Sequence, residues 1–247
     1  MRRTRVIPCL CLQGGGLVKT RKFKDPVYIG DPVNAVKIFS DKEADEICVL
    51  DIAASRSGKE PDYELLAEMA GEAFMPMSYG GGISNVAQIR RLIRCGIEKI
   101  VVNSYSVNNL QWLQEAVQVF GSQAIVGCLD VKKTLFGSYR LMTHSATKEG
   151  KVELDLHIKK LVDAGVGEIF INSIDRDGTM SGYDLPLLQQ IVNSVTVPVV
   201  ICGGAGTTDD LKEAVRHGAS GVAAGSMFVF HGKHRAVLIS YSNSVSV

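Results

Sequence analysis

The chain has 247 residues, of which 46% are hydrophobic, and its formal net charge is only +1. This length fits one large domain or two small ones. A near-neutral chain has no strong positive potential that would attract nucleic acid or a membrane surface. No apolar run approaches the ~20 residues that span a bilayer, and the basic start MRRTRV turns polar too soon for a signal peptide. Six cysteines without a CxxC pair argue against a disulfide framework or a zinc site. We therefore expect no metal, no cofactor and a reducing cytoplasm.

Short β-branched runs alternate with segments of helical period along the chain. The predicted strands are 5–11, 46–51, 75–79, 99–103, 124–130, 168–172, 197–202 and 221–224. Helical period is clear at 31–44, 63–73, 85–96 and 210–219, with Asp31 and Asp209 as predicted N-caps and Gly96 and Gly218 as predicted C-cap glycines. Strands this apolar indicate a parallel sheet covered on its outside, and eight of them close a (β/α)₈ barrel. A doubly wound open sheet is the alternative.

An internal repeat divides the predicted barrel into halves of about 1–122 and 123–247. MPMSYGGGIS resembles VPVVICGGAGT, so that Gly80 and Gly203 lie 123 positions apart. IPCLCLQGGG likewise pairs with VGCLDVKKTL, which sets Cys11 119 positions before Asp130. The near-constant spacing predicts two half-barrels of four βα units within a single domain.

Both glycine clusters follow an apolar strand and precede a helix. Glycine lets backbone N–H groups approach an anion, and a helix N-terminus adds a favourable dipole. A small polar pair ends the next strand in each half, Asn103 with Ser104 and Gly225 with Ser226. Two such sets predict a phosphate site on each side of the barrel mouth, and so a substrate with two phosphates. The alternative is that these glycines only make tight turns.

Acidic residues lie at or just beyond the C-terminal strand ends, the face where barrel active sites are built. They are Asp51, Asp130, Asp175 and Asp177. Burial after an apolar strand could raise the pKa of Asp130 towards that of a useful acid or base, whereas the alternative for all four is helix capping or pairing with a cation. Lys19 either binds an anionic substrate or is a solvated loop lysine.

Cys11 is the last residue of the first predicted strand, where a carboxylate would be expected. A metal role lacks partner ligands. A nucleophilic role lacks an obvious base, because no histidine ends a strand, although a loop could bring one close.

Four charged residues sit at strand starts, at the opposite end of the predicted barrel. They are Arg5, Glu46, Lys99 and Glu168. They could form a ring of ion pairs around the axis, but spacing alone favours ordinary solvated strand ends.

The segments LVKT, GDPV, YGGGI, LDVKK, SIDRDGT with GYDL, VPVVICGGAG and AAGSMF, in this order, resemble HisF, the cyclase subunit of imidazole glycerol phosphate synthase, over nearly the whole chain. The resemblance implies a (β/α)₈ barrel with a glutaminase, HisH, on its N-terminal face. Ammonia from the glutaminase crosses the barrel to the bisphosphorylated substrate PRFAR, and the products are imidazole glycerol phosphate and AICAR. The implied phosphate contacts are Gly82, Asn103, Ser104, Gly178, Gly204, Gly225 and Ser226, and the implied ammonia gate is Arg5, Glu46, Lys99 and Glu168.

The family's acid/base pair is two aspartates; Asp130 matches the second, and Cys11 occupies the position of the first. A thiol among apolar residues resists ionisation and is a poor substitute for a carboxylate. Lys19, Asp51 and Asp177 complete the candidate catalytic set.

GGLVKTRKFKDPVYIGDPVNAVKIFSDKEADE and GSMFVFHGKHRAVLISY closely resemble HisF-like proteins encoded with surface-polysaccharide genes. There, a HisF-like and a HisH-like protein are thought to supply ammonia to a separate amidotransferase for acetamidino modification of a lipopolysaccharide sugar. We therefore expect an ammonia-channelling subunit of this kind, without nucleic-acid or membrane partners. The alternatives are a working cyclase of histidine biosynthesis and an inert scaffold that only activates the glutaminase.

Overall fold

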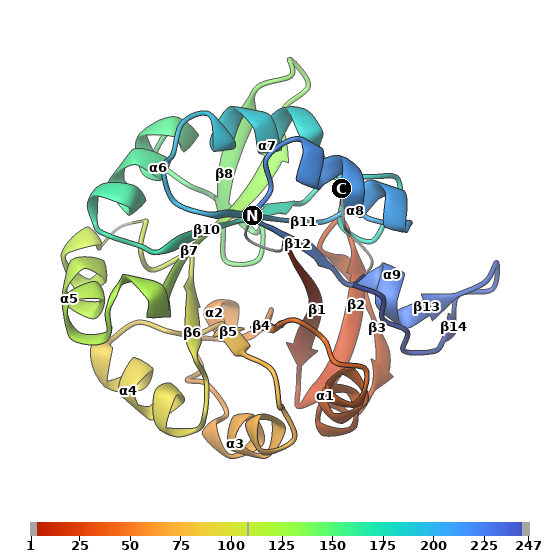
Figure 1. Ribbon diagram of the computed structural model, residues 1–247. Helices are drawn as coiled ribbons and strands as arrows, with labels where there is room; N and C mark the ends of the chain where they lie inside the picture. Colours follow the sequence, from red (N-terminus) through yellow and green to blue (C-terminus); the bar gives the residue numbers. More distant parts are fainter. Residues whose placement is uncertain (1–3, 108, 244–247) are drawn as a thin grey trace.

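Eight parallel strands close into a barrel in the computed structural model, which describes residues 4–107 and 109–243. The barrel strands are β1 (Arg5–Gln13), β4 (Ile47–Asp51), β5 (Met77–Gly80), β6 (Lys99–Val102), β7 (Ile125–Lys133), β10 (Glu168–Ser173), β11 (Val199–Cys202) and β12 (Gly221–Ala224). Each strand pairs in parallel with the next, and the pairings of β7 with β10 and of β12 with β1 complete the ring (Figure 1). The predicted (β/α)₈ barrel is confirmed, and the open-sheet alternative is wrong.

Seven longer helices surround the barrel in the described part of the chain (Figure 1). They are α1 (Pro32–Asp41), α3 (Tyr63–Gly71), α4 (Val86–Arg94), α5 (Leu110–Phe120), α6 (Leu154–Asp163), α7 (Leu185–Val192) and α8 (Thr208–Arg216). Short turns of helix are α2 (Ala54–Ser57), η1 (Ser122–Ala124) and α9 (Ser226–Val229). Within the described ranges, no helix combines the length and apolar character needed to cross a bilayer.

Three of the four predicted helix-end residues are placed as expected. The Asp31 side chain accepts the N–H of Asn34 and caps α1, and Gly96 and Gly218 directly follow the C-cap residues of α4 and α8 with positive φ. The prediction for Asp209 is wrong, because Thr207 caps α8 and leaves Asp209 in the first turn. Thr207 and Asp210 exchange side-chain and backbone hydrogen bonds in a capping box, which fixes the helix start two residues earlier.

Antiparallel hairpins extend two of the barrel strands, and the sequence pattern did not predict them. β2 (Gly16–Arg21) and β3 (Lys24–Gly30) continue from β1, while β8 (Tyr139–Thr143) and β9 (Lys148–Glu149) continue from β7. The expected glycine-rich loop is instead a tight turn at Gly14 and Gly15, with φ of 61° and 79°. Cys11 consequently lies two residues before the end of β1 rather than at it.

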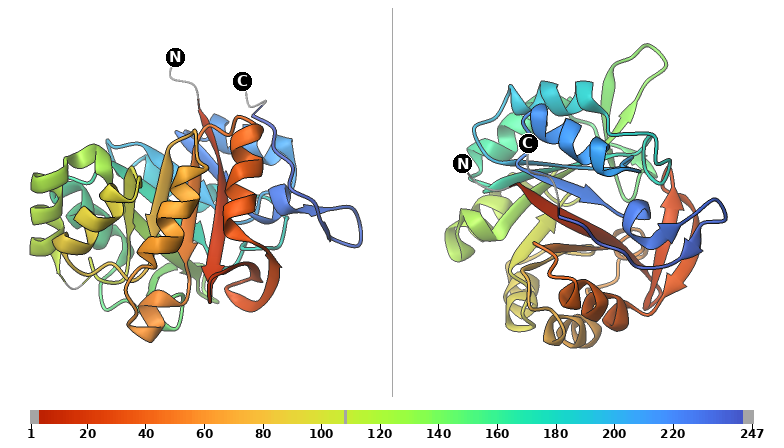
Figure 2. Two further views of the ribbon diagram at one scale, coloured as in Figure 1. Left: turned by 90° about the horizontal axis from the view of Figure 1, so that it is seen from below. Right: turned by 45° about the vertical axis from the view of Figure 1, so that its right-hand side comes forward.

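The hairpins follow the first strand of each predicted half, which agrees with the half-barrel repeat; that repeat remains a prediction. Figure 2 shows the β7–β8 turn, in light green, projecting from the barrel. A third hairpin, β13 (Phe230–His231) with β14 (Ala236–Val237), projects separately in blue (Figure 2).

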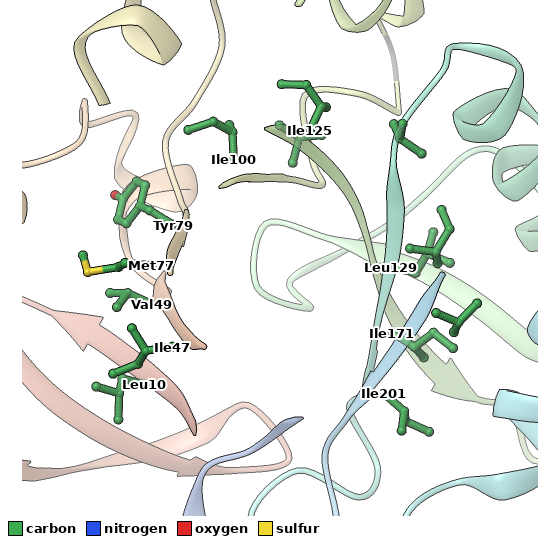
Figure 3. Close-up of a cluster of buried hydrophobic side chains, with 14 of the residues drawn as sticks. Leu10, Ile47, Val49, Met77, Tyr79, Ile100, Ile125, Leu129, Ile171 and Ile201 are labelled. Carbon is green, nitrogen blue, oxygen red and sulfur yellow. The ribbon is translucent and has the colours of Figure 1, made fainter. Parts of the chain in front are cut away.

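Alternating side chains give the barrel two separate cores. Those labelled in Figure 3, such as Leu10, Val49 and Ile171, point away from the barrel axis into the layer between strands and helices. The opposite set lines the lumen in stacked layers, as barrel interiors do. The buried lumen residues are Ile7, Cys9, Cys48, Val101, Val126, Cys128, Phe170, Val200, Cys202 and Ala223.

Candidate functional site

A cavity of about 660 Å³ opens at the C-terminal ends of the barrel strands. Its lining includes every predicted catalytic and phosphate-binding residue: Cys11, Lys19, Asp51, Gly82, Asn103, Ser104, Asp130, Asp177, Gly178, Gly204, Gly225 and Ser226. Asp175 is not part of this lining; its carboxylate accepts the backbone N–H of Lys133 at 2.7 Å. Thus residues spread over more than 200 positions of sequence meet at one cavity.

Asp130 lies in β7 with its side chain held between two amides. Nδ2 of Asn103 donates to its Oδ2 at 2.7 Å, and Nδ2 of Asn172 donates to its Oδ1 at 3.3 Å. Burial raises the pKa of Asp130 to about 7, although both amide hydrogen bonds favour the charged form. The side chain can therefore give or take a proton near neutral pH, and within the described part of the chain it forms no ion pair with a lysine or arginine.

Cys11 lies on β1, beside Val18 of β2 and Leu50 of β4. Burial raises the pKa of its thiol to about 12, while the Lys19 ammonium opposes this shift. At neutral pH the thiol is protonated, so this position supplies neither a charge nor an exchangeable proton of useful acidity.

Lys19 lies on β2 rather than in a loop, and only 6% of it is exposed. Its Nζ donates to the backbone oxygen of Cys9 at 2.5 Å. Gly225 makes room for this amine, since a Cβ built there would overlap Nζ. The alternative of a solvated lysine is wrong, because the ammonium is enclosed beside the cavity floor.

Asp51 and Asp177 both have structural partners. Oδ1 of Asp51 accepts the N–H groups of Ala53 and Ala54 at 2.9 Å each, which caps the start of α2. Oδ2 of Asp177 accepts from Thr20 Oγ1 at 2.7 Å and from the Phe23 N–H at 3.1 Å, which secures the β2–β3 turn. Burial raises the pKa of Asp177 even though these two bonds lower it. The capping alternative therefore describes Asp51 well, while Asp177 remains an acid of altered pKa at the cavity wall.

The cavity glycines occupy positions that no larger residue could take unchanged. Gly82, Gly178 and Gly204 have φ of 67°, 66° and 113°, and a Cβ on any of them would overlap a backbone oxygen of a neighbouring segment. These glycines therefore make tight turns, as the alternative held. They also line the cavity, where their backbone N–H groups could meet a phosphate, so the turn-forming role does not exclude the predicted one. Phosphate binding at these residues stays a prediction.

The tip of the β8–β9 hairpin also reaches the cavity, which the strand pattern did not reveal. The His144 N–H donates to Ser104 Oγ at 2.8 Å, and Ser145 Oγ donates to the backbone oxygen of Ile52 at 2.7 Å. His144, Ser145 and Ala146 all have positive φ, which few non-glycine residues adopt. The one available signal was the unusual stretch THSATKEG. Other lining residues that the sequence did not single out are Arg56 and Lys59.

The four charges at the strand starts form a closed ring of ion pairs. Arg5 contacts Glu46 and Glu168 at 2.5 Å each, and Lys99 contacts the same two carboxylates at 2.7 and 3.7 Å. The side chain of Glu46 is only 4% exposed. The expectation of separate solvated strand ends is wrong, because barrel closure brings these residues together. We call this set the charged ring. Across the described ranges, no three His, Cys, Asp or Glu side chains are grouped to hold a metal ion.

Together these features define a (β/α)₈-barrel protein with a polar cavity at the C-terminal end of its strands and a charged ring at the other end. Residues 5–235 match the family described as histidine biosynthesis protein. The chain is 50% identical over 242 residues to a Pseudomonas aeruginosa protein with the provisional name imidazole glycerol phosphate synthase subunit hisF2, covering 98% of this chain and 96% of that one. A Leptospira interrogans protein provisionally named subunit HisF is 48% identical over 245 residues, at 98% and 96% coverage. A Vibrio vulnificus protein provisionally named subunit hisF3 is 48% identical over 243 residues, at 98% and 94% coverage. The chain belongs to this histidine biosynthesis family, as a HisF-type subunit.

Proposed function

We propose that this subunit receives ammonia from a HisH-like glutaminase at the charged ring and passes it through the barrel to the cavity. The observation that supports this most is a contrast between the two ends of the barrel. The ring is complete, with every ion pair within 4 Å, whereas at the mouth Asp130 is a carboxyl group but the matching position on β1 carries the Cys11 thiol.

Transit requires neutral ammonia, because an ammonium ion would pay a large desolvation penalty in the lumen. The ring would have to open to admit it, by breaking a contact such as the one between Lys99 and Glu168, at 3.7 Å the longest of the four. Above the ring, most of the lumen is lined by apolar side chains such as Val101, Val126 and Val200, which cannot protonate ammonia. Beyond them lies Asp130, whose pKa of about 7 suits proton transfer.

We further propose that the ammonia serves acetamidino modification of a surface-polysaccharide sugar in the cytoplasm, through a separate sugar amidotransferase, with a phosphorylated small molecule at the mouth. Support comes from the resemblance of this chain to barrels of that setting and from the thiol at Cys11. Cyclisation that needs two carboxylates would be impaired, while transfer of ammonia needs neither.

One observation favours a different function, a working cyclase of histidine biosynthesis. Asp130 keeps a pKa of about 7, and the glycines on both sides of the cavity are in place. Asp130 would then act alone or with Asp177, which also lines the cavity and also has a raised pKa.

The deciding experiment is a cyclase assay of the chain with its cognate glutaminase and PRFAR. We expect little turnover for the native chain and an increase of about 100-fold for Cys11→Asp, since general acid–base catalysis is worth that much. Cys11→Ser is the matched control, because it has nearly the same size but no carboxylate. High turnover of the native chain, equal to that of Cys11→Asp, or rescue of a histidine auxotroph by the native chain, would contradict the proposal and support the cyclase.

A further inference from the structure

Three thiols form a cluster inside the barrel, directly beneath the mouth cavity. Cys9, Cys48 and Cys202 belong to one cluster of buried lumen side chains, and Cys48 is the direct neighbour of Cys9 on the next strand. All three residues are buried, with exposed fractions of 4%, 1% and 6%. Cys9 and Cys202 nevertheless line the cavity floor, so a small molecule in the cavity can reach them. Neither the acid chemistry at Asp130 nor the charged ring uses this cluster.

The backbone sets which pair of these thiols can be joined covalently. Cys9 and Cys48 are direct partners in the parallel pairing of β1 with β4, and both side chains belong to the lumen core. Neighbouring strands lie about 4.8 Å apart, inside the ~4.4–6.8 Å Cα range of disulfides. Cys202 lies on β11, which β12 separates from β1, so two strand spacings divide it from Cys9. Cys48 is therefore the partner that a disulfide at Cys9 would take.

The environment of Cys9 differs from that of its neighbours. Hydrogen bonds from Cys202 and Cys48 lower the pKa of the Cys9 thiol, burial opposes them, and the Lys19 ammonium lowers it further. Nζ of Lys19 is held next to this residue by its hydrogen bond to the Cys9 oxygen. The pKa of Cys48 is raised instead, by its hydrogen bond to Cys9 and by burial. Cys9 lines the cavity and Cys48, its direct neighbour, does not, so Cys9 is placed to meet an oxidant first and Cys48 to resolve the product.

We propose that Cys9 and Cys48 form a peroxide-sensitive dithiol that closes to a disulfide. The Cys9 thiolate attacks the O–O bond of hydrogen peroxide; an S–O bond forms, the O–O bond breaks, and water leaves after taking up a proton. The Cys48 sulfur then displaces the hydroxyl group of the Cys9 sulfenic acid, so that an S–S bond forms and a second water leaves. The two thiols lose two electrons to one peroxide. The cross-link lies in the wall of the lumen, on the path that the proposed function assigns to ammonia, so ammonia delivery by the oxidised complex is a second readout that rests on that function.

The test uses the isolated, reduced full-length chain, titrated with hydrogen peroxide. Cys9 and Cys11 are only two residues apart, so a Cys11→Ser background makes the assignment unambiguous. We expect the loss of two free thiols, a linked pair of Cys9 and Cys48 peptides in a non-reducing digest, and full recovery with dithiothreitol. In Cys48→Ser, the Cys9 sulfenic acid persists and reacts with a cyclic 1,3-dione.

Cys95→Ser is the control, because the Cys95 thiol lies outside the barrel and donates a hydrogen bond to the backbone oxygen of Tyr63. It should cross-link like the native chain, whereas Cys9→Ser and Cys9→Ala should not. A link from Cys9 to Cys202 or Cys128, or intact Cys9 at a peroxide dose that oxidises free glutathione, would overturn the inference. Since mapping on the native chain needs no substitution in the core, a variant that fails to fold leaves the test valid.

The two proposals fail separately. Cross-linking is measured without a glutaminase, so its absence leaves ammonia delivery by the reduced complex unaffected. If the chain cross-links but the reduced complex passes no ammonia, the dithiol proposal is supported and the proposed function is contradicted.

Discussion

Asn103 donates its side-chain N–H to Oδ2 of Asp130 at 2.7 Å, which joins a predicted phosphate position to the acid of the neighbouring strand. The other amide atom, Oδ1 of Asn103, is buried and accepts no hydrogen bond from the described residues. Asn172 supports the second carboxylate oxygen of Asp130. An anion that drew the Asn103 N–H groups away from Asp130 would remove a hydrogen bond to the charged form and so raise the pKa of this acid.

Asn103→Leu should raise the pKa of Asp130 above about 7, because it removes a bond to the charged form while burial remains. A hydrogen bond to a charged group is worth roughly 1.5–3 kcal/mol, so an increase of at least about one pH unit is expected. Carbon-detected NMR titration of labelled aspartate measures it. Asn193→Leu, at the exposed end of α7, is the control. An unchanged or lower pKa in Asn103→Leu would show that the amide does not stabilise the carboxylate.

Gly225→Ala should displace the Lys19 amine from the Cys9 oxygen. The new Cβ would overlap Nζ and lie 3.0 Å from that oxygen, so we expect a loss of about 2 kcal/mol in the free energy of unfolding. Urea titration measures this loss. Gly71→Ala is the matched control, because nothing lies within 4 Å of a Cβ there. The loss should disappear in a Lys19→Ala background; a loss that persists would place the clash elsewhere.

The barrel itself could be predicted because parallel strands are buried on both faces and read as apolar runs. All eight predicted strands overlap the observed ones, with ends that differ by at most three residues. The hairpins after β1 and β7 were missed because their strands are partly exposed and carry no such run. Lys19 was misplaced for a different reason: residues 17–20 are buried, but nothing local shows that GLVKTR folds back along β1.

Site residues could be predicted where their role follows from their position along one strand. They could not be predicted where it depends on the closing of the barrel, which brings distant strands together. Cys11 and Asp130 could be placed at the mouth from the repeat. The contact of Arg5 with Glu168 depends on strands 163 positions apart meeting at one end, which spacing does not reveal. The approach of His144 to Ser104 depends on a run of three non-glycine residues with positive φ, a conformation that no local preference favours.

His157 should make the chain less stable below neutral pH. It is fully buried in α6, neither ring nitrogen has a hydrogen-bond partner among the described residues, and burial lowers its pKa to about 4. Above pH 6.5 both the folded and unfolded forms are neutral; between 6.5 and 4 only the unfolded form takes up a proton. Stability contributed by neutral His157 is thus lost as the pH falls through this window, by ~3 kcal/mol in total.

His157→Leu removes this proton uptake, and its urea-derived free energy of unfolding should depend less on pH than that of the native chain between 6.5 and 4. His231→Leu, in the exposed β13–β14 hairpin, should keep the native pH dependence. Parallel curves for the native chain and His157→Leu would mean that the buried imidazole does not control acid stability.

Glu46 should be the most costly member of the charged ring to remove. It accepts from Arg5 and from Lys99 at 2.5 and 2.7 Å and is nearly excluded from water, so Glu46→Ala leaves two partly buried cations facing Glu168 alone. Loss of one partner of a buried pair costs about 3–5 kcal/mol, and we expect the lower end because the two cations retain Glu168.

The matched control for Glu46 is the pair of Arg140 with Glu149 on the exposed β8–β9 hairpin, which has a similar separation of 2.9 Å. Both side chains there are more than half exposed, so solvent screens the pair and Glu149→Ala should cost less than about 1 kcal/mol. A double-mutant cycle of Glu46→Ala with Arg5→Ala should give a coupling above about 1 kcal/mol, since the two groups share one network. Equal losses of unfolding free energy for Glu46→Ala and Glu149→Ala would show that burial does not strengthen the ion pairs of the charged ring. The ring residues would then be held together by the barrel backbone alone.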